Sequence, residues 1–300
     1  GDTIYSAVSE AYRKIRNTCR YLLGNLYDFE PTRDVVVAEQ MLELDRFILA
    51  RLERLKAAVR RAFETYDFQD AFHAILNFVV VDLSSLYIDV ARDRLYCGGA
   101  ESVERRSAQT ALYALLDSLV RMLAPLIPFT ADEVYLRIPG RTAESVHLLT
   151  LSEAKPQLAD AALEARWERL LQLREQTLKL LEQMRQAGTI GAPLEARIAI
   201  GADSGGWAET LRTSGGLLKE LFIVSEVEIL PDSEISKLRA RANGAHEFDT
   251  DGQVGRITTS PSTVILGRRA GGRKCQRCWC YYDDGGHPDL CERCRAVVRA

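Results

Sequence analysis

The 300-residue sequence lacks an uninterrupted run of eighteen apolar residues, so we expect no membrane-spanning helix and no membrane partner. Residues 1–5 lack the charged-then-apolar pattern of a signal peptide. An excess of charge of one sign is also lacking, because 39 Lys and Arg stand against 42 Asp and Glu. The total charge therefore gives no indication of nucleic-acid binding, and any such indication must come from how the basic residues are distributed.

Cysteine is scarce over most of the chain. Of the seven cysteines, Cys19 and Cys97 stand alone, and the other five lie within residues 275–294. A secreted disulfide scaffold would be small and would spread its cysteines along the chain. We therefore expect a reducing compartment, the cytoplasm, together with a metal site in the cysteine-rich segment. The two isolated cysteines are expected to be inert thiols.

Apolar residues at helical spacing dominate the first half of the chain and predict an antiparallel helical bundle over residues 1–150. Asp67 is a candidate N-cap for one of its helices and Thr130 for another. The predicted helices cover residues 4–26, 44–63, 68–79, 83–96, 103–124 and 130–136.

Residues 151–232 have a different pattern, which predicts a long helix followed by a small α/β junction domain. The helix should run over residues 161–187 and end at Gly188. Strand, helix and strand patterns then follow at residues 196–200, 207–221 and 222–230. Residues 233–270 read as a polar connector with short strands near residues 263–266. The predicted fold class is α+β, mostly α, and ends in a cysteine-rich module at residues 271–300.

Two Cys-x-x-Cys motifs are the strongest chemical signal. Cys275 and Cys278 form the first, Cys291 and Cys294 form the second, and twelve residues separate them. Such paired motifs let four thiolates converge on one tetrahedral Zn²⁺ at about 2.3 Å from each sulfur. Because four protein ligands leave no open coordination position, the zinc should be structural rather than catalytic.

Other assignments of these residues remain open at the level of sequence. Cys280 or His287 could replace one of the four ligands, and iron fits the same spacing as zinc. A redox-active disulfide is a further alternative for any Cys-x-x-Cys motif.

Basic and aromatic residues surround the cysteines. Residues 267–300 contain eight Lys and Arg but four Asp and Glu. Aromatic faces beside cationic side chains suit unpaired bases and phosphates. Our candidates for nucleic-acid contact are Lys274, Arg277, Trp279 and Arg293, although Trp279 could instead pack on the metal knuckle.

A row of polar side chains lies opposite the apolar stripe of the first predicted helix. It consists of Arg13, Arg16, Asn17 and Arg20. Such a row could contact a phosphate backbone, or it could simply be a solvated helix face.

Several segments, in order along nearly the whole chain, resemble the bacterial-type isoleucyl-tRNA synthetase family. The bundle motifs are also compatible with related class I synthetases, and the zinc module is what favours the isoleucine enzymes. The matching segments are residues 12–18 (YRKIRNT), 20–26 (RYLLGNL), 82–89 (DLSSLYID), 92–96 (RDRLY), 123–133 (LAPLIPFTADE), 190–196 (IGAPLEA), 274–279 (KCQRCW) and 291–294 (CERC).

The resemblance implies a C-terminal, tRNA-binding portion of such an enzyme. The parent enzyme would use ATP to activate isoleucine and would transfer it to tRNA(Ile). Its His-Ile-Gly-His and Lys-Met-Ser-Lys-Ser signatures do not occur here, so we expect no catalytic residue in this chain and ATP binding only in a catalytic core that it lacks. The implied partners are the anticodon arm of tRNA(Ile) and, within the same monomeric enzyme, that core. A free-standing RNA-binding module, a zinc-containing interaction scaffold and a redox protein remain the alternatives.

Overall fold

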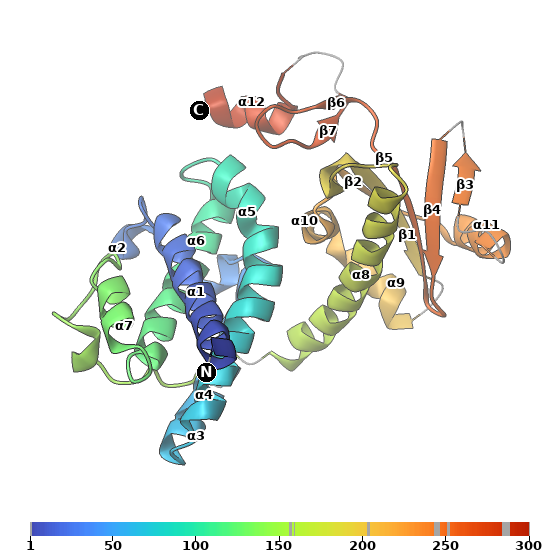
Figure 1. The fold of residues 1–300 in the computed structure, drawn as a ribbon. Helices are drawn as coiled ribbons and strands as arrows, with labels where there is room; N and C mark the ends of the chain where they lie inside the picture. Colours follow the sequence, from blue (N-terminus) through green and yellow to red (C-terminus); the bar gives the residue numbers. More distant parts are fainter. Residues whose placement is uncertain are drawn as a thin grey trace. The chain divides into compact units, whose positions relative to one another are not determined.

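The computed structural model describes most of the chain and divides it into two compact units, Gly1–Ala161 and Ala162–Ala300 (Figure 1). Each unit is described by itself. The described residues are 2–155, 158, 160–202, 205–242, 247–250, 253–283 and 289–299.

The first unit is a helical bundle, as the sequence predicts. Its long helices α3 and α6 pack against each other, and both contact the helical stretch that begins with α4. The elements are α1 (Asp2–Gly24), α2 (Pro31–Asp34), the 3-10 helix η1 (Ala38–Gln40), α3 (Glu43–Glu64), α4 (Phe68–Asn77), the π-helix η2 (Phe78–Tyr87), α5 (Ile88–Cys97), α6 (Val103–Leu123), α7 (Pro128–Tyr135) and the 3-10 helix η3 (Val146–Leu148).

The N-termini of α4 and α7 test the two N-caps that the sequence predicts. The Asp67 side chain accepts a hydrogen bond from the Asp70 amide and caps α4, which confirms that prediction. The cap predicted at Thr130 is wrong, because α7 begins at Pro128. Proline suits the first helical position, since its fixed φ is preorganised for a helix and its missing N–H would have no intrahelical partner there. The Thr130 hydroxyl instead forms a 2.9 Å hydrogen bond with the hydroxyl of Tyr12.

Helices α4, η2 and α5 form one continuous helical stretch, Phe68–Cys97. In its π-helical middle, the Ser84 and Ser85 hydroxyls donate to the carbonyls five residues earlier, at Val79 and Val80. By length and apolar character this stretch could cross a membrane, but more than half of its most apolar window is buried within the fold. A buried core helix has the same composition.

The second unit is built around a mixed five-stranded sheet with the order β2-β1-β5-β4-β3. Strand β1 runs parallel to β2 and antiparallel to β5, and the β5–β4 and β4–β3 pairs are antiparallel. The elements are α8 (Ala161–Gln186), the 3-10 helix η5 (Pro193–Glu195), β1 (Ala196–Ala202), α9 (Gly205–Ser214), α10 (Leu217–Phe222), β2 (Glu226–Ile229), α11 (Asp232–Ala242), β3 (Glu247–Thr250), β4 (Gln253–Thr259) and β5 (Thr263–Arg269).

The long helix ends close to where the sequence predicts, with Gly188 just beyond it at a φ of +72°. The helix predicted over residues 207–221 is two helices, α9 and α10, separated at Gly215 and Gly216. The second predicted strand is shorter than expected, because Phe222 ends α10 and Ile223 takes a left-handed conformation at φ +57°.

The segment expected to be a polar connector supplies much of the second unit. It contains α11, and β5 lies at the centre of the sheet. Apolar side chains from β1, β4, β5, α11 and the residue after β2 form one buried cluster, which fixes this helix on the sheet. The cluster consists of Ala199, Leu230, Ile235, Leu238, Ile257, Val264 and Leu266.

Candidate metal centre and nucleic-acid interface

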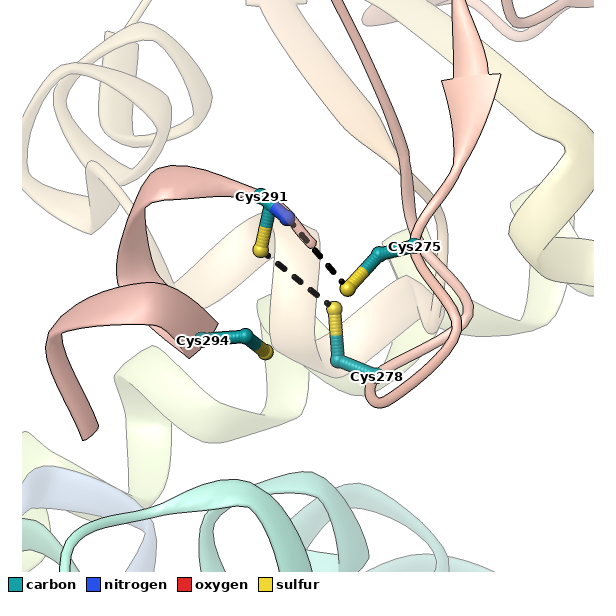
Figure 2. A group of neighbouring side chains, drawn as sticks. All are labelled: Cys275, Cys278, Cys291 and Cys294. Carbon is teal, nitrogen blue, oxygen red and sulfur yellow. Dashed lines mark hydrogen bonds between the residues drawn. The ribbon is translucent and has the colours of Figure 1, made fainter. Parts of the chain in front are cut away.

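In its described residues, the cysteine-rich module consists of a short hairpin and one helix. Strands β6 (Arg273–Lys274) and β7 (Tyr281–Tyr282) pair antiparallel, and the first Cys-x-x-Cys motif forms the loop between them. Cys291 immediately precedes helix α12 (Glu292–Arg299), and Cys294 lies in its first turn. The hairpin loop and the helix start therefore bring the two motifs together (Figure 2).

The four sulfur atoms lie close enough together to hold one metal ion. The Sγ atoms of Cys275, Cys278, Cys291 and Cys294 all lie within 4.8 Å of one another. Those of Cys278 and Cys291 are 3.7 Å apart. Four sulfurs at about 2.3 Å from a central zinc would be about 3.8 Å apart, so the donor set and its spacing fit Zn²⁺.

Donors around the cluster are aimed at the sulfurs. The Cys291 amide donates to Cys275 Sγ at 3.5 Å, and the Arg277 guanidinium lies 3.8 Å from Cys294 Sγ. Such donors favour thiolate, the form that binds metal. The pKa of Cys278 is lowered, mainly by a hydrogen bond with Cys280. Burial instead raises the pKa of Cys291. A bound cation would allow all four thiols to ionise together.

Cys280 and His287 are the two residues that could replace one of the four cysteine ligands. Cys280 is partly buried beside Cys278 but is not one of the four clustered cysteines. His287 lies outside the described residues.

The two isolated cysteines, Cys19 and Cys97, are both buried. Burial raises the pKa of Cys19 to about 12. Burial and a raised pKa both disfavour the reactive thiolate at Cys19.

The module is anchored to the sheet of the second unit. The Tyr281 amide donates to Ser225 Oγ at 2.6 Å, and the Ser225 amide donates to the carbonyl of Ala196 at 3.0 Å. The Ala270 amide donates to the Glu195 carbonyl at 2.7 Å. These hydrogen bonds lie at the beginning of β1 and just before β2.

Trp279 is held outward. The residue is 60% exposed, so much of its ring is accessible from solvent. Its backbone takes a left-handed conformation at φ +65°, and its amide donates to the Cys275 carbonyl at 2.9 Å. The Lys274 ammonium lies 5.6 Å from the ring centroid. This places an exposed aromatic face beside a cation.

The polar row on α1 is exposed as the helical spacing predicts. Arg13, Arg16, Asn17 and Arg20 are exposed, whereas the opposite stripe turns into the bundle. The neighbouring Lys14 forms an exposed 2.7 Å ion pair with Glu10. The row and the metal module belong to different units, and each offers a basic surface of its own.

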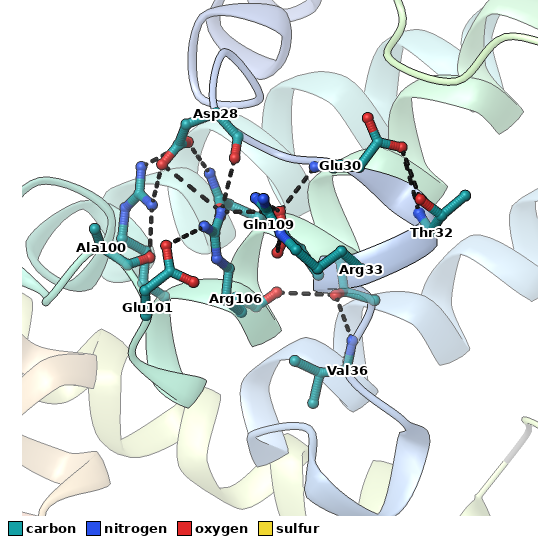
Figure 3. Close-up of polar contacts among 12 residues, drawn as sticks. Asp28, Glu30, Thr32, Arg33, Val36, Ala100, Glu101, Arg106 and Gln109 are labelled. Carbon is teal, nitrogen blue, oxygen red and sulfur yellow. Dashed lines mark hydrogen bonds and ion pairs between the residues drawn. The ribbon is translucent and has the colours of Figure 1, made fainter.

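Sequence reasoning missed the buried polar networks of the bundle. The Arg105 guanidinium donates two hydrogen bonds, of 2.7 and 2.9 Å, to the Asp28 carboxylate. The Gln109 amide donates to the same carboxylate at 2.8 Å (Figure 3). Arg106 donates to the Asp28 carbonyl at 3.0 Å. The network ties the loop after α1 to α6. The sequence did contain one signal for this network. Helix α6 is buried for most of its length yet contains charged residues, and a buried charge needs a partner.

The model of the family "Anticodon-binding domain of tRNA ligase" matches residues 45–200. The chain belongs to this family. It is 43% identical to the isoleucine–tRNA ligase of Syntrophotalea carbinolica over 299 residues, and 42% identical to that of Desulforudis audaxviator over 300 residues. Each alignment covers 98% of this chain, which spans 30% of the length of either relative.

A solved structure also aligns weakly with the chain. It is the ternary complex of Agrobacterium radiobacter K84 agnB2 LeuRS with tRNA and LeuAMS, and it covers 85% of this chain and 24% of the LeuRS chain. The identity is 13% and the TM-score is 0.36, which is too low to define the fold.

Proposed function

We propose that this chain is the tRNA-binding portion of an isoleucine–tRNA ligase and that it recognises the anticodon arm of tRNA(Ile). The observation that carries the proposal is the alignment of 98% of the chain with isoleucine–tRNA ligases, together with the match to the anticodon-binding family. ATP-dependent activation of isoleucine and its transfer to tRNA belong to a catalytic portion that this chain does not contain. The chain alone makes no aminoacyl adenylate, and the whole enzyme works as a monomer in the cytoplasm.

The two basic surfaces have different roles in this proposal. Arg13, Arg16, Asn17 and Arg20 lie along one exposed helix face, where guanidinium groups can bind backbone phosphates. Around the metal module, Lys274, Arg277, Trp279 and Arg293 offer cations and one exposed ring. The bases of an anticodon loop are unpaired, so they can stack on such a ring and expose their edges to hydrogen-bonding groups.

The four clustered cysteines hold one structural Zn²⁺ in the proposed enzyme. When bound, the ion supplies a tetrahedral crosslink between the β6–β7 loop and the start of α12. The chain's own contribution is to present four sulfurs at the right spacing and to aim Arg277 and the Cys291 amide at them. The module has few buried apolar side chains, so metal binding contributes much of its folding free energy.

Binding to tRNA(Ile) and to a non-cognate tRNA, before and after zinc removal, tests the proposal. We expect cognate-selective binding that is lost with the metal. Equal binding to both tRNAs, or none to either, in the full-length protein would contradict it.

A truncation at residue 270 of the full-length ligase tests the division of labour. We expect isoleucine-dependent ATP–pyrophosphate exchange to persist and tRNA aminoacylation to fall. Loss of the exchange reaction itself would show that the metal module serves the catalytic centre rather than tRNA binding.

A further inference from the structure

Residues 149–155 form a linker that follows η3 and leads towards α8, and they lie outside helices and strands. Side chains from α3 and α6 hold the first part of this linker. From α3, Arg60 donates to the Leu151 carbonyl at 3.1 Å. From α6, Arg121 donates to the Thr150 carbonyl at 3.4 Å. Both contacts place the start of the linker against the bundle.

The end of the linker is held by a buried carboxylate on α3. The Lys155 amide donates to Oε2 of Glu53 at 2.6 Å. The other oxygen, Oε1, accepts from the Lys56 ammonium at 2.7 Å, and the Glu53 and Lys56 side chains are 6% and 8% exposed. Lys56 therefore neutralises the carboxylate through one oxygen, while the second oxygen binds the linker. A charged acceptor makes this hydrogen bond stronger than a backbone carbonyl would.

Stability of α3 alone does not account for this ion pair. Removing two charges from water is costly, and apolar side chains of similar volume often replace a buried ion pair without loss of stability. Glu53 and Lys56 are three residues apart on one helix, so their ion pair joins no two elements of the bundle. The contact that joins distant parts of the chain is the one between Glu53 and Lys155, which are 102 residues apart.

We propose that Glu53 is a positioning residue for tRNA binding, because it fixes the linker so that the chain leaves the helical unit along one defined path. This inference rests on the proposed function. The row on α1 and the metal module belong to different units, so one tRNA that binds both must restrict the connection between them. A linker that is already fixed loses less conformational entropy in that step, and the second surface then binds at a higher effective concentration.

Two double variants of the full-length ligase separate this role from a purely structural one. Both remove the buried ion pair. Glu53→Met/Lys56→Met leaves no side-chain acceptor at position 53 for the Lys155 amide, whereas Glu53→Gln/Lys56→Met keeps a side-chain carbonyl oxygen there. Neither variant leaves an unpaired buried charge, so both should fold.

Hydrogen exchange of the Lys155 amide, resolved with overlapping peptides, measures the contact itself. We expect exchange about 10-fold faster in Glu53→Met/Lys56→Met than in the unaltered ligase, because the bond that protects this amide is lost. Exchange in Glu53→Gln/Lys56→Met should stay close to that of the unaltered ligase. Equal exchange rates in the two variants would overturn the proposal.

Aminoacylation kinetics measure the consequence for tRNA. Glu53→Met/Lys56→Met should raise KM for tRNA about 10-fold and leave kcat and isoleucine-dependent ATP–pyrophosphate exchange unchanged, because only tRNA binding is weakened. Glu53→Gln/Lys56→Met should keep the original KM. An unchanged KM in the first variant, or the same rise in both, would overturn the positioning role. Failure of the proposed function is distinguishable, because the unaltered ligase would then show no aminoacylation while its Lys155 amide stayed protected.

Discussion

Arg94 and Asp45 form a two-pronged ion pair inside the helical unit, with N–O distances of 2.7 and 2.8 Å. Both side chains are buried. The Asp45 carboxylate also accepts hydrogen bonds from the hydroxyls of Tyr87 and Ser107, at 2.7 and 2.5 Å. One buried charge thus organises α3, α5, α6 and the π-helix.

Arg94→Met should lower the free energy of unfolding by about 3–5 kcal/mol, because it leaves the Asp45 charge buried without its countercharge. Urea unfolding followed by circular dichroism at 222 nm measures the loss. All three tryptophans, Trp167, Trp207 and Trp279, belong to the second unit, so their emission should report an unchanged transition there.

Arg137→Met is the matched control, since Arg137 pairs with Glu133 on the surface of the same unit. It should leave the helical transition almost unchanged. A loss in Arg94→Met no larger than in this control would show that the buried pair adds little to stability.

The stability of the helical unit should depend on pH through Asp34. The Arg33 guanidinium beside it lowers the pKa of this carboxyl to about 2. A carboxyl with a depressed pKa stabilises the fold above its unfolded pKa of about 3.9 and loses that contribution as pH falls towards 2. The contribution should be about 1 kcal/mol, because the Arg33 side chain is 65% exposed and solvent screens the pair.

Urea unfolding between pH 2.5 and 6, followed at 222 nm, measures this dependence. Asp34→Asn should flatten it between about pH 4 and 2.5. Glu64→Gln, at the exposed end of α3, should keep the profile of the unaltered protein. Identical profiles for Asp34→Asn and the unaltered protein would exclude this role of Asp34.

The metal assignment predicts different results for two neighbouring cysteines. Cys278→Ser should lose the bound zinc and expose residues 271–299 to proteolysis, because three thiolates no longer close the tetrahedron. Cys280→Ser should retain one zinc per chain. Atomic absorption and limited proteolysis measure both effects, and zinc loss in Cys280→Ser but not in Cys278→Ser would reassign the ligands.

The polar row on α1 should contribute to tRNA binding through its charges. In the full-length ligase, Ala substitution of Arg13, Arg16 or Arg20 should weaken binding of cognate and non-cognate tRNA alike. Each lost phosphate contact should reduce the slope of log K against log salt concentration by about 0.7–0.9. Lys14→Ala on the same helix is the control, because Lys14 is already paired with Glu10. An unchanged slope in all three Arg variants would make the row a solvated face.

The features that sequence predicted well are local. Helical periodicity located most of the bundle, because the apolar residues that define a helix lie within a few turns of one another. The four cysteines could be identified because each pair is three residues apart and thiolates have few other roles in such spacing. Which side chains contact tRNA stays a prediction, since exposure alone does not distinguish a binding face from a solvated one.

The features that sequence missed depend on partners far apart in the chain. Asp45 and Arg94 are 49 residues apart, and no local pattern pairs them. The pairing of β1 with β5 is also non-local, so residues 233–270 looked like a connector although β5 is central to the sheet. The π-helix was missed because the usual helical period of about 3.6 residues corresponds to i to i+4 backbone bonds, whereas a π-helix forms i to i+5 bonds.

The order of strands also sets when each unit can fold during synthesis on the ribosome. The helical unit is complete in the nascent chain by Ala161. Strand β1 must wait for β5, since Ala202 pairs with Thr263 and Ala196 with Arg269. At about 5–20 residues per second, this leaves β1 without its antiparallel partner for several seconds. Translation therefore delivers a finished helical unit first. The stage most exposed to aggregation is the β1–β2 pair, whose β1 strand still has one edge free until β5 is made.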